Sequence, residues 1–578
     1  MRKIILTLLL GALAGCETLP TPQTSEEAVE AAAAPVLPFE APEPIERELD
    51  ADLLFDFLVG EIGARQGEFQ VAHQGYLEAA LEASDAYAAE RATLLALHIK
   101  DLDAALEGAS LWAQFAPNSQ DARKYLAVLL LRRDRFDEAL AEFSAMRRIG
   151  DALGKDGRLQ VATVLAGEPG RNAARKMLER VLADDSEAPE ALYASALLDT
   201  THGRFSEANE TLVKALQAEP DWPVARILLS RVLVARKAPQ MALEVLATGV
   251  QREPENKLLR KSYARLLVAN GRHAQALDQF RELHDLSSGD VEVAYGYAML
   301  ATDQKAWDEA RGIWQQLRDE PKYRTEAGYF LGQIEEHEGN DELALELYRS
   351  IDEGPLMTDA AIRAARLLQK AGDLDAARML LREARAANPK RAIDLYLTEA
   401  QLMQSAESAV DAVLEVYAEA LRYHPADNDL LYNRGLYLSE VGHYDRMEAD
   451  FRAVLDKDPK DVNALNALGY MLAEQNIRLQ EARGYIEQAL SLKPELAAIL
   501  DSMGWVLYRL GELEASLGYL KKAYEKDQDA EIAAHLIEVH WVLGDRDSAE
   551  ELLRSAIRKD PDSRFLLPLR ERLMTEFP

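Results

Sequence analysis

The stretch Gly203–Pro220, GRFSEANETLVKALQAEP, contains the main features of the structural unit from which this chain is built. Gly203 can adopt the left-handed backbone conformation that ends a helix. Ala208 and Ala215 lie two turns apart on one helix face, so a neighbouring helix can approach closely there. Pro220 cannot continue a helix and therefore ends the unit.

The same unit recurs along nearly the whole chain with a period of about 34 residues, which indicates a solenoid of stacked helix pairs. Its first small or apolar position recurs at Ala72, Ala105, Ala139, Ala174, Ala208, Ala242, Ala276, Ala310, Ala344, Ala377, Val413, Met447, Ala482, Ser516 and Ala549. Turn glycines recur at Gly67, Gly203, Gly271, Gly339, Gly372, Gly442, Gly511 and Gly544. Lys237 and Ser408 stand where a turn glycine is expected, so those two turns are less regular.

This pattern resembles the tetratricopeptide repeat family over roughly residues 50–561. The resemblance implies an all-α, right-handed superhelical solenoid of about fifteen helix-turn-helix repeats. We assign residues 49–561 to the solenoid and residues 562–578 to a C-terminal cap, because repeat arrays need a polar-faced end. The glycines between 150 and 170 weaken the pattern and predict one looser repeat.

The composition favours helices and disfavours nucleic acid as a partner. Ala, Leu, Glu and Arg are abundant, and no sustained strand-like alternation is present. The 99 acidic and 66 basic residues give a formal net charge of −33, which repels phosphate. The acidity has two explanations, a soluble surface or attraction for a basic protein partner.

The first sixteen residues, MRKIILTLLLGALAGC, have the pattern of a bacterial export signal. A short basic region precedes the apolar run Ile4–Leu13, which is too short for a stable membrane-spanning helix. The sequence Leu13-Ala14-Gly15-Cys16 resembles the lipobox of bacterial lipoproteins. This resemblance implies a signal peptide over residues 1–15 and acylation of Cys16.

Cys16 is the only cysteine of the chain, so no disulfide can form within it. The alternative is an ordinary secretory leader that contains an incidental cysteine. Lipoprotein sorting patterns further imply the outer membrane, because Glu17 rather than an aspartate follows Cys16. We therefore expect a lipid-anchored protein that faces the periplasm.

Residues 16–48 are rich in Pro, Ala and Glu, which predicts a disordered tether. An amphipathic helix then begins near Leu49, with Leu53, Leu54, Phe57 and Leu58 on one stripe. It is either the first helix of the first repeat or an exposed helix that awaits a partner. We favour the first of these two interpretations.

No catalytic or metal-binding motif is apparent. The chain has no His-Glu-x-x-His sequence, no phosphate-binding Gly-rich loop and no Gly-x-Ser-x-Gly elbow. His535 and His540 are five residues apart and fall on different helix faces. His337 lies among glutamates, a pattern more typical of a solvated helix end than of a metal site. The sequence therefore predicts a non-enzymatic protein without metal or cofactor.

A surface for binding proteins remains. The first helix of each repeat lines the concave side of such solenoids, and the family resemblance implies that its exposed positions contact the ligand. Carried over to the C-terminal repeats, this gives Tyr432, Asn433, Leu436, Asn466, Tyr470, Asp501, Trp505, Tyr508, His535, Glu538 and Trp541. Aromatic residues with polar neighbours suit peptide binding. Alternatively, Tyr470 and Trp505 pack against the neighbouring repeat.

The layout of lipobox, tether and long array resembles outer-membrane lipoproteins that partner a periplasmic carboxy-terminal processing protease. The resemblance implies an adaptor that presents protein substrates, such as cell-wall hydrolases, to that protease. The fold does not force this choice. The first alternative is a scaffold for an envelope export machine, in exopolysaccharide secretion or pilus assembly. The second is an enzyme with an unrecognised site.

Overall fold

The computed structural model describes residues 51–576, and this part of the chain contains thirty-one α-helices, one 3-10 helix and no strand. The predicted signal peptide, Cys16 and the tether lie outside the described residues. The chain divides into two compact units, with the boundary in the sequence between Leu317 and Arg318, and each unit is described separately below. None of the helices described is both long and apolar enough to span a bilayer.

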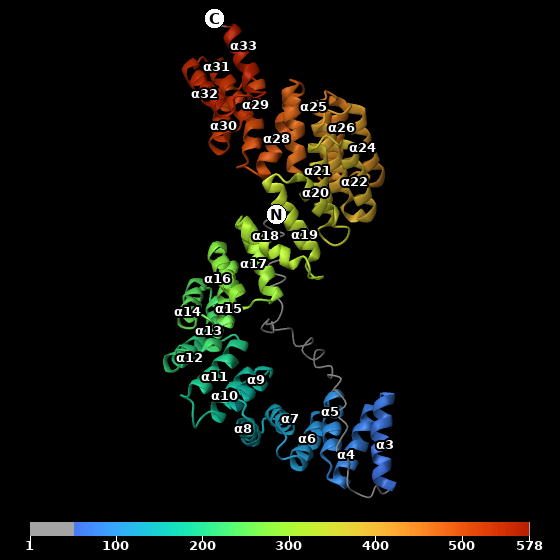
Figure 1. The fold of residues 1–578 in the computed structure, drawn as a ribbon, viewed down its shortest axis with the longest axis vertical. Helices are drawn as coiled ribbons and strands as arrows, with labels where there is room; N and C mark the ends of the chain where they lie inside the picture. The colour runs from blue at the N-terminus through green and yellow to red at the C-terminus, as the bar shows by residue number, and fades with distance from the viewer. Residues whose placement is uncertain (1–50, 577–578) are drawn as a thin grey trace. The chain divides into compact units, whose positions relative to one another are not determined.

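The first unit consists of eight antiparallel helix pairs stacked in chain order (Figure 1). The pairs are α3 (Ala51–Gln66) with α4 (Phe69–Ala83), α5 (Ala86–His98) with α6 (Leu102–Phe115), α7 (Gln120–Arg132) with α8 (Phe136–Ala152), α9 (Gly157–Ala166) with α10 (Arg171–Val181), α11 (Pro189–Thr201) with α12 (Phe205–Ala218), α13 (Pro223–Ala235) with α14 (Pro239–Arg252), α15 (Lys257–Ala269) with α16 (His273–Leu286), and α17 (Val291–Asp303) with α18 (Trp307–Leu317).

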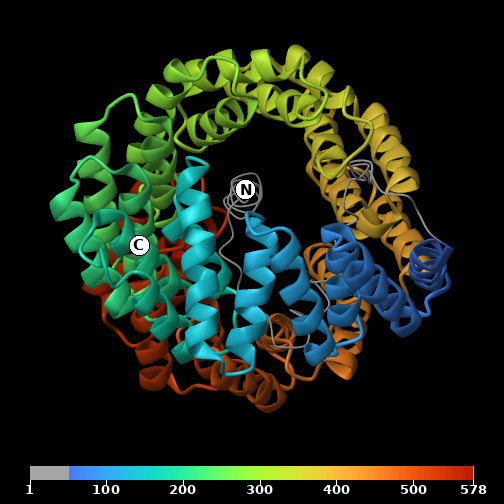
Figure 2. The same ribbon diagram turned by 90° about the horizontal axis from the view of Figure 1, so that it is seen from below.

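The second unit adds seven pairs and a final helix, again stacked in antiparallel pairs (Figure 2). The helices are α19 (Arg324–Glu338) with α20 (Asp341–Arg349), α21 (Met357–Lys370) with α22 (Leu374–Ala387), α23 (Ala392–Ser405) with α24 (Val410–Tyr423), α25 (Asn428–Glu440) with α26 (Tyr444–Lys457), α27 (Val462–Glu474) with α28 (Leu479–Leu492), α29 (Ala497–Arg509) with α30 (Leu513–Lys526), α31 (Ala530–Val542) with α32 (Arg546–Lys559), and α33 (Leu566–Glu576); η1 (Pro389–Arg391) precedes α23.

The periodic small residues form the seam along which the helices pack. All fifteen positions from Ala72 to Ala549 are at most 1% exposed. A small side chain there lets two helix backbones approach each other, and the neighbouring leucines fill the remaining space. The prediction of an all-α solenoid of about fifteen helical hairpins is therefore confirmed.

The turns inside the hairpins share one backbone conformation. In fourteen of the fifteen hairpins, the turn contains a residue with a positive φ angle. Eight of these turns use a predicted glycine, and the other six use Lys100, Asp134, Lys237, Lys305, Glu407 and Asn476. The turn of Asn476 contains a second such residue, Arg478. Lys237 thus adopts the glycine conformation with φ 60°. In the other irregular turn, where the sequence indicated Ser408, the residue with this conformation is Glu407, one position earlier.

The exception is the hairpin α9–α10, which the sequence predicted to be loose. Two of the glycines in this region, Gly150 and Gly157, are points of close contact between α8 and α9. A Cβ atom on Gly157 would lie 2.2 Å from the carbonyl oxygen of Arg147, and one on Gly150 would lie 2.3 Å from Oε1 of Gln160. The glycines therefore allow the end of α8 and the start of α9 to touch.

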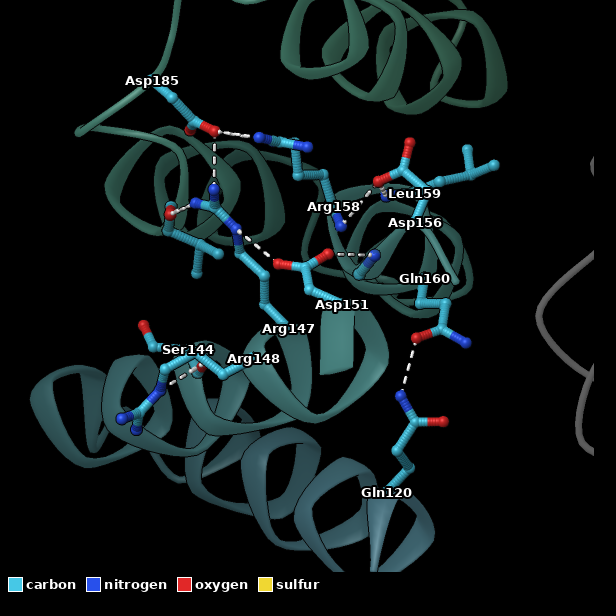
Figure 3. A network of polar contacts seen from close by, with 12 residues as sticks. Gln120, Ser144, Arg147, Arg148, Asp151, Asp156, Arg158, Leu159, Gln160 and Asp185 are labelled. Atoms are coloured by element: carbon cyan, nitrogen blue, oxygen red, sulfur yellow. Dashed lines mark hydrogen bonds and ion pairs between the residues drawn. The ribbon is translucent and has the colours of Figure 1, made fainter. Parts of the chain in front are cut away.

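Polar contacts hold this contact region together (Figure 3). The Arg147 guanidinium donates to the carbonyl oxygen of Val181 at 2.9 Å and to Asp185 at 2.6 Å. Arg158 donates to the same carboxylate at 2.6 Å, so Asp185 joins α8 to α9. The Gly157 N–H also donates to Asp151 at 2.9 Å.

Candidate protein-binding site

The candidate residues lie on α25, α27, α29 and α31, the first helices of the last four hairpins. The structure brings six of the eleven into one cluster that spans three hairpins, namely Tyr470, Asp501, Trp505, Tyr508, His535 and Glu538. We call these six residues the aromatic cluster. First helices place them together because each hairpin repeats the register of the preceding one.

Trp505 is the centre of the aromatic cluster and is only 5% exposed. Its ring stacks on His535 with a centroid distance of 4.0 Å and an interplanar angle of 22°. Its Nε1–H donates to the Glu474 carboxylate at 2.7 Å, and the Arg509 guanidinium lies over the ring at 5.3 Å. Trp505 therefore packs between hairpins, which is the alternative that the sequence left open for this residue.

His535 carries the main electrostatic feature of the site. Its Nδ1 lies 3.0 Å from Asp501 Oδ1, and both side chains are buried. Burial lowers the pKa of His535, but the charge of Asp501 and its hydrogen bond outweigh that effect and raise the pKa above 6.5. Glu531 and Glu474 act in the same direction. The charged form of His535 is thus favoured beneath an acidic surface.

Two tyrosines of the aromatic cluster donate hydrogen bonds to glutamates on α31. The Tyr470 hydroxyl donates to Glu531 at 2.6 Å, although α27 and α31 belong to hairpins that are not consecutive. The Tyr508 hydroxyl donates to Glu538 at 3.0 Å, and burial with that carboxylate raises the pKa of Tyr508 to about 12. Burial, together with the Glu531 charge, also raises the pKa of Tyr470 strongly. Both hydroxyls are therefore donors at neutral pH.

The remaining candidates lie apart from the cluster. Tyr432 packs against Phe451 of its own hairpin at 5.7 Å. The Asn433 amide donates to the Asp429 carbonyl oxygen at 2.8 Å, so it is engaged within its own helix. Leu436 is 39% exposed and presents an apolar surface beside them.

Asn466 and Trp541 have different surroundings. The Oδ1 atom of Asn466 is buried without a hydrogen-bond partner. Trp541 is half-buried, and the Arg546 guanidinium lies 3.8 Å from its ring centroid. This cation–π pair joins α31 to α32 within one hairpin.

Sequence reasoning missed Glu474, Glu531 and Arg572. Glu474 follows Tyr470 by four residues, and Glu531 precedes His535 by four, so each shares a helix face with a candidate. That spacing was the available signal. Arg572 of α33 pairs with Glu538 at 2.8 Å, a contact between helices that no local pattern reveals.

The accessible part of this site is acidic and aromatic. Glu474 is exposed, while Glu531, Glu538, Tyr470 and Tyr508 are half-buried around the covered Trp505 and His535. Such a surface can accept hydrogen bonds and positive charge from a peptide. Within residues 51–576, no group of three or more His, Cys, Asp or Glu side chains is placed to hold a metal ion.

Comparison with known proteins agrees with this architecture. Models of the tetratricopeptide repeat match residues 199–266 in one case and 263–324, 432–497 and 502–564 in another. The TPR repeat-containing protein PA4667 of Pseudomonas aeruginosa is 32% identical over 544 residues, which cover 92% of this chain and 89% of that protein.

Solved structures show only distant likeness. The yeast Tom70 crystal structure matches with 13% identity and a TM-score of 0.33, covering 91% of this chain and all of that one. The Pseudomonas aeruginosa pilF structure matches with 21% identity and a TM-score of 0.30, covering 37% of this chain and 97% of that one. TM-scores this low support no functional comparison.

Proposed function

Because the chain belongs to the tetratricopeptide repeat family, a family of protein-interaction scaffolds, we propose that it is an adaptor of the bacterial envelope. In this proposal Cys16 carries the lipid anchor in the outer membrane. The solenoid holds protein substrates, such as cell-wall hydrolases, in the periplasm and presents them to a carboxy-terminal processing protease. The adaptor itself performs no chemistry.

The observation that carries the binding role is the acidic rim around the aromatic cluster. Glu474, Glu531 and Glu538 come from two first helices, and their carboxylates are held by Trp505, Tyr470 and Tyr508. Because these donors fix the carboxylates in place, little side-chain entropy is lost when a ligand binds. A segment with basic residues would find oriented acceptors there.

The packing changes the roles expected of the individual aromatic residues. A partner reaches little of Trp505, since 95% of it is covered. We assign Trp505 and His535 to the floor of the site. The half-buried Tyr470 and Tyr508 provide its contact surface, and the glutamates provide its charge.

Charge reversal tests this site, and because Glu474→Lys also removes the acceptor of the Trp505 Nε1–H, stability is measured beside binding. Glu474→Lys with Glu538→Lys should reduce binding of a captured substrate at least tenfold, because two acceptors become repulsive cations. The matched control is Glu487→Lys with Glu512→Lys. Both residues are exposed, Glu487 on α28 and Glu512 at the start of α30. Thermal denaturation of both variants separates lost binding from lost stability.

Crosslinking in intact cells, followed by mass spectrometry, tests the identity of the partners. A periplasmic processing protease together with murein hydrolases would support the adaptor role. Subunits of an export channel or pilus machine in their place would overturn it. Equal binding by the site variant and its control would instead reject the acidic rim while leaving the adaptor role standing.

A further inference from the structure

A basic segment interrupts the otherwise acidic chain. Residues 222–272 contain ten basic and three acidic residues, a net charge of +7. The whole chain has 66 basic and 99 acidic residues, so its remainder carries 56 and 96, a net charge of −40. The segment contains α13, α14 and α15 of the first unit. A uniformly acidic surface that keeps the chain soluble does not explain this local reversal of charge.

The first helices α13 and α15 concentrate the positive charge. Together they contain six basic residues and no acidic residue. The three acidic residues of the segment lie elsewhere, Glu244 on α14 and Glu253 and Glu255 in the connection between α14 and α15. The charge therefore follows the side of the array that the first helices form.

Two of the six basic residues have a structural role. Arg226 and Arg260 hold equivalent positions in their hairpins, and both are buried. Arg226 donates to the carbonyl oxygen of Pro220 at 2.8 Å, and Arg260 donates to that of Pro254 at 2.7 Å. Each arginine thus ties a first helix to the turn before it. The other four are exposed or half-buried, and we call them the basic face: Arg231, Lys257, Lys261 and Arg265.

The repeat register brings the basic face together. Arg231 and Arg265 are the ninth residues of α13 and α15, which contact each other within the first unit (Figure 1). Lys257, Lys261 and Arg265 are spaced four residues apart and share one side of α15. In the second unit, the ninth residues of α27 and α29 belong to the aromatic cluster. The same repeat position therefore carries cations in one unit and aromatic rings in the other.

Stability does not account for the cations of α15. Lys257, Arg260 and Lys261 lie among its first five residues, where the helix dipole disfavours positive charge, and no acidic residue compensates in the first turn. Among the described residues, neither lysine forms an ion pair, whereas Arg252 of α14 pairs with Asp221 at 2.5 Å. The placement of the two lysines costs stability, so a bound partner is the better explanation for them.

Apolar side chains accompany the cations. Val224 and Val234 of α13 are 41% and 43% exposed, and Leu258 of α15 is 46% exposed. Val224 precedes Arg231 by seven residues and Val234 follows it by three, so all three share one side of α13. Leu258 precedes Arg265 by the same seven residues. A ligand of this surface therefore meets positive charge and apolar area together.

The size of the basic face favours a short acidic protein segment over a larger polyanion. Two helices packed about 10 Å apart present a surface about 20 Å wide, which about six extended residues cross. At physiological ionic strength, charges more than about 8 Å away are largely screened, so a short segment on this surface meets mainly the local positive charge. Nucleic acid or an anionic bilayer extends further and meets the remaining charge of −40, which repels phosphate.

We propose that the basic face binds an extended acidic protein segment whose carboxylates alternate with apolar residues. The carboxylates pair with the four cations, and the apolar side chains contact Val224, Val234 and Leu258. This ligand has the opposite charge to the one proposed for the acidic rim of the second unit. The two units thus bind segments of different chemistry, and the basic face does not depend on the adaptor role.

Binding of a fluorescent peptide to the full chain tests the basic face. The probe is a short peptide in which Asp and Glu alternate with Leu and Val, and a reference peptide carries Asn and Gln in place of the acids. Lys257→Glu with Lys261→Glu should weaken binding of the acidic peptide at least tenfold. The melting temperature should not fall, because glutamate suits the start of α15. The reference peptide should bind the unchanged chain at least tenfold more weakly than the acidic one.

The matched control is Lys176→Glu with Lys214→Glu, which makes the same change of net charge on the second helices α10 and α12. Both lysines are exposed, and this variant should bind the acidic peptide as the unchanged chain does. The acidic-rim variant, Glu474→Lys with Glu538→Lys, should also bind it unchanged. Failure of one site is therefore distinguishable from failure of the other.

Four results would overturn the proposal. The first is equal peptide binding by Lys257→Glu with Lys261→Glu and by its control. The second is a lower melting temperature of the basic-face variant alone, which would assign the lysines to the fold. Binding of phosphatidylglycerol vesicles that this variant loses would assign the face to a membrane. Concentration-dependent self-association in sedimentation that it loses would assign the face to a second copy of the chain.

Discussion

The two ends of the repeat array are finished in different ways. At the C-terminal end, Leu566, Leu569 and Leu573 of α33 are at most 6% exposed in a cluster with α31 and α32. At the N-terminal end, the comparable side of α3 is about half exposed. A terminal repeat needs a cover for its apolar side, and only the C-terminal end has one among the described residues. The comparison shows that a helix buries the apolar side of the last hairpin, whereas the described residues leave that side of α3 about half exposed.

The largest expected effect comes from truncating a leucine at each end. Leu566→Ala should cost about 2–5 kcal/mol, because it opens a cavity in a packed cap. Leu58→Ala on a bare α3 should change stability by no more than about 0.5 kcal/mol. Hydrogen exchange of α31–α33 and of α3–α4 measures each end separately. Equal losses of stability from Leu566→Ala and Leu58→Ala would contradict this comparison of the two ends.

An interior repeat provides the reference for both ends, because its helices are covered on each side. Ala276→Trp should cost about 1–3 kcal/mol, since a bulky ring cannot fit where the helices of the hairpin nearly touch. Gln275→Trp, on the exposed neighbour, is the control and should be near neutral. Circular dichroism should show mainly helix in all forms, with a lower melting temperature only for Ala276→Trp. An unchanged melting temperature would mean that the seam tolerates large side chains.

The seam was predictable because it depends on local periodicity. Fifteen small positions, such as Ala208 and Ala276, follow from spacing alone, and each is buried as expected. The close contact at Gly157 was missed because its reason lies in Arg147, on another helix. Sequence shows that Gly is present, but not which backbone approaches it.

The candidate site was predictable only as a set of positions on first helices. The register placed Tyr470, Trp505 and His535 on the same side of successive hairpins, and the structure brings their rings together. Whether such rings face solvent or one another depends on the spacing between three helices. Since that spacing is a tertiary property, the sequence could not decide whether the Trp505 ring is exposed to a partner or packs between hairpins. Contact of these residues with a partner stays a prediction.

A smaller effect should make the C-terminal end sensitive to pH. The raised pKa of His535 means that its charged form is stabilised in the folded state. This stabilisation is fully present below about pH 6.5, the ordinary pKa of an unfolded histidine, and is lost as the pH rises through the raised folded pKa. Asp501→Asn removes the main cause of the raised pKa, although Glu531 and Glu474 still face the histidine. Its cost in urea denaturation should therefore be larger at about pH 6 than at about pH 9. A larger cost at the higher pH would contradict the assignment.

The smallest expected effect concerns the turns, which the two ends and the interior share. Lys237 holds a left-handed backbone with φ 60°, whereas Gly203 holds the same conformation with φ 77° in the preceding hairpin. A side chain in that conformation costs about 1–2 kcal/mol, while glycine loses about 0.5–1 kcal/mol through its greater freedom when unfolded. Lys237→Gly should therefore stabilise the chain by about 0.5–1 kcal/mol. Gly203→Ala should destabilise it by a similar amount.

A Cβ atom at Gly203 meets nothing within 4 Å, so the backbone alone accounts for the cost of Gly203→Ala. Urea denaturation measures the free energy of unfolding of both variants. If Lys237→Gly lowered it as Gly203→Ala does, contacts of the Lys237 side chain would outweigh the cost of its backbone conformation.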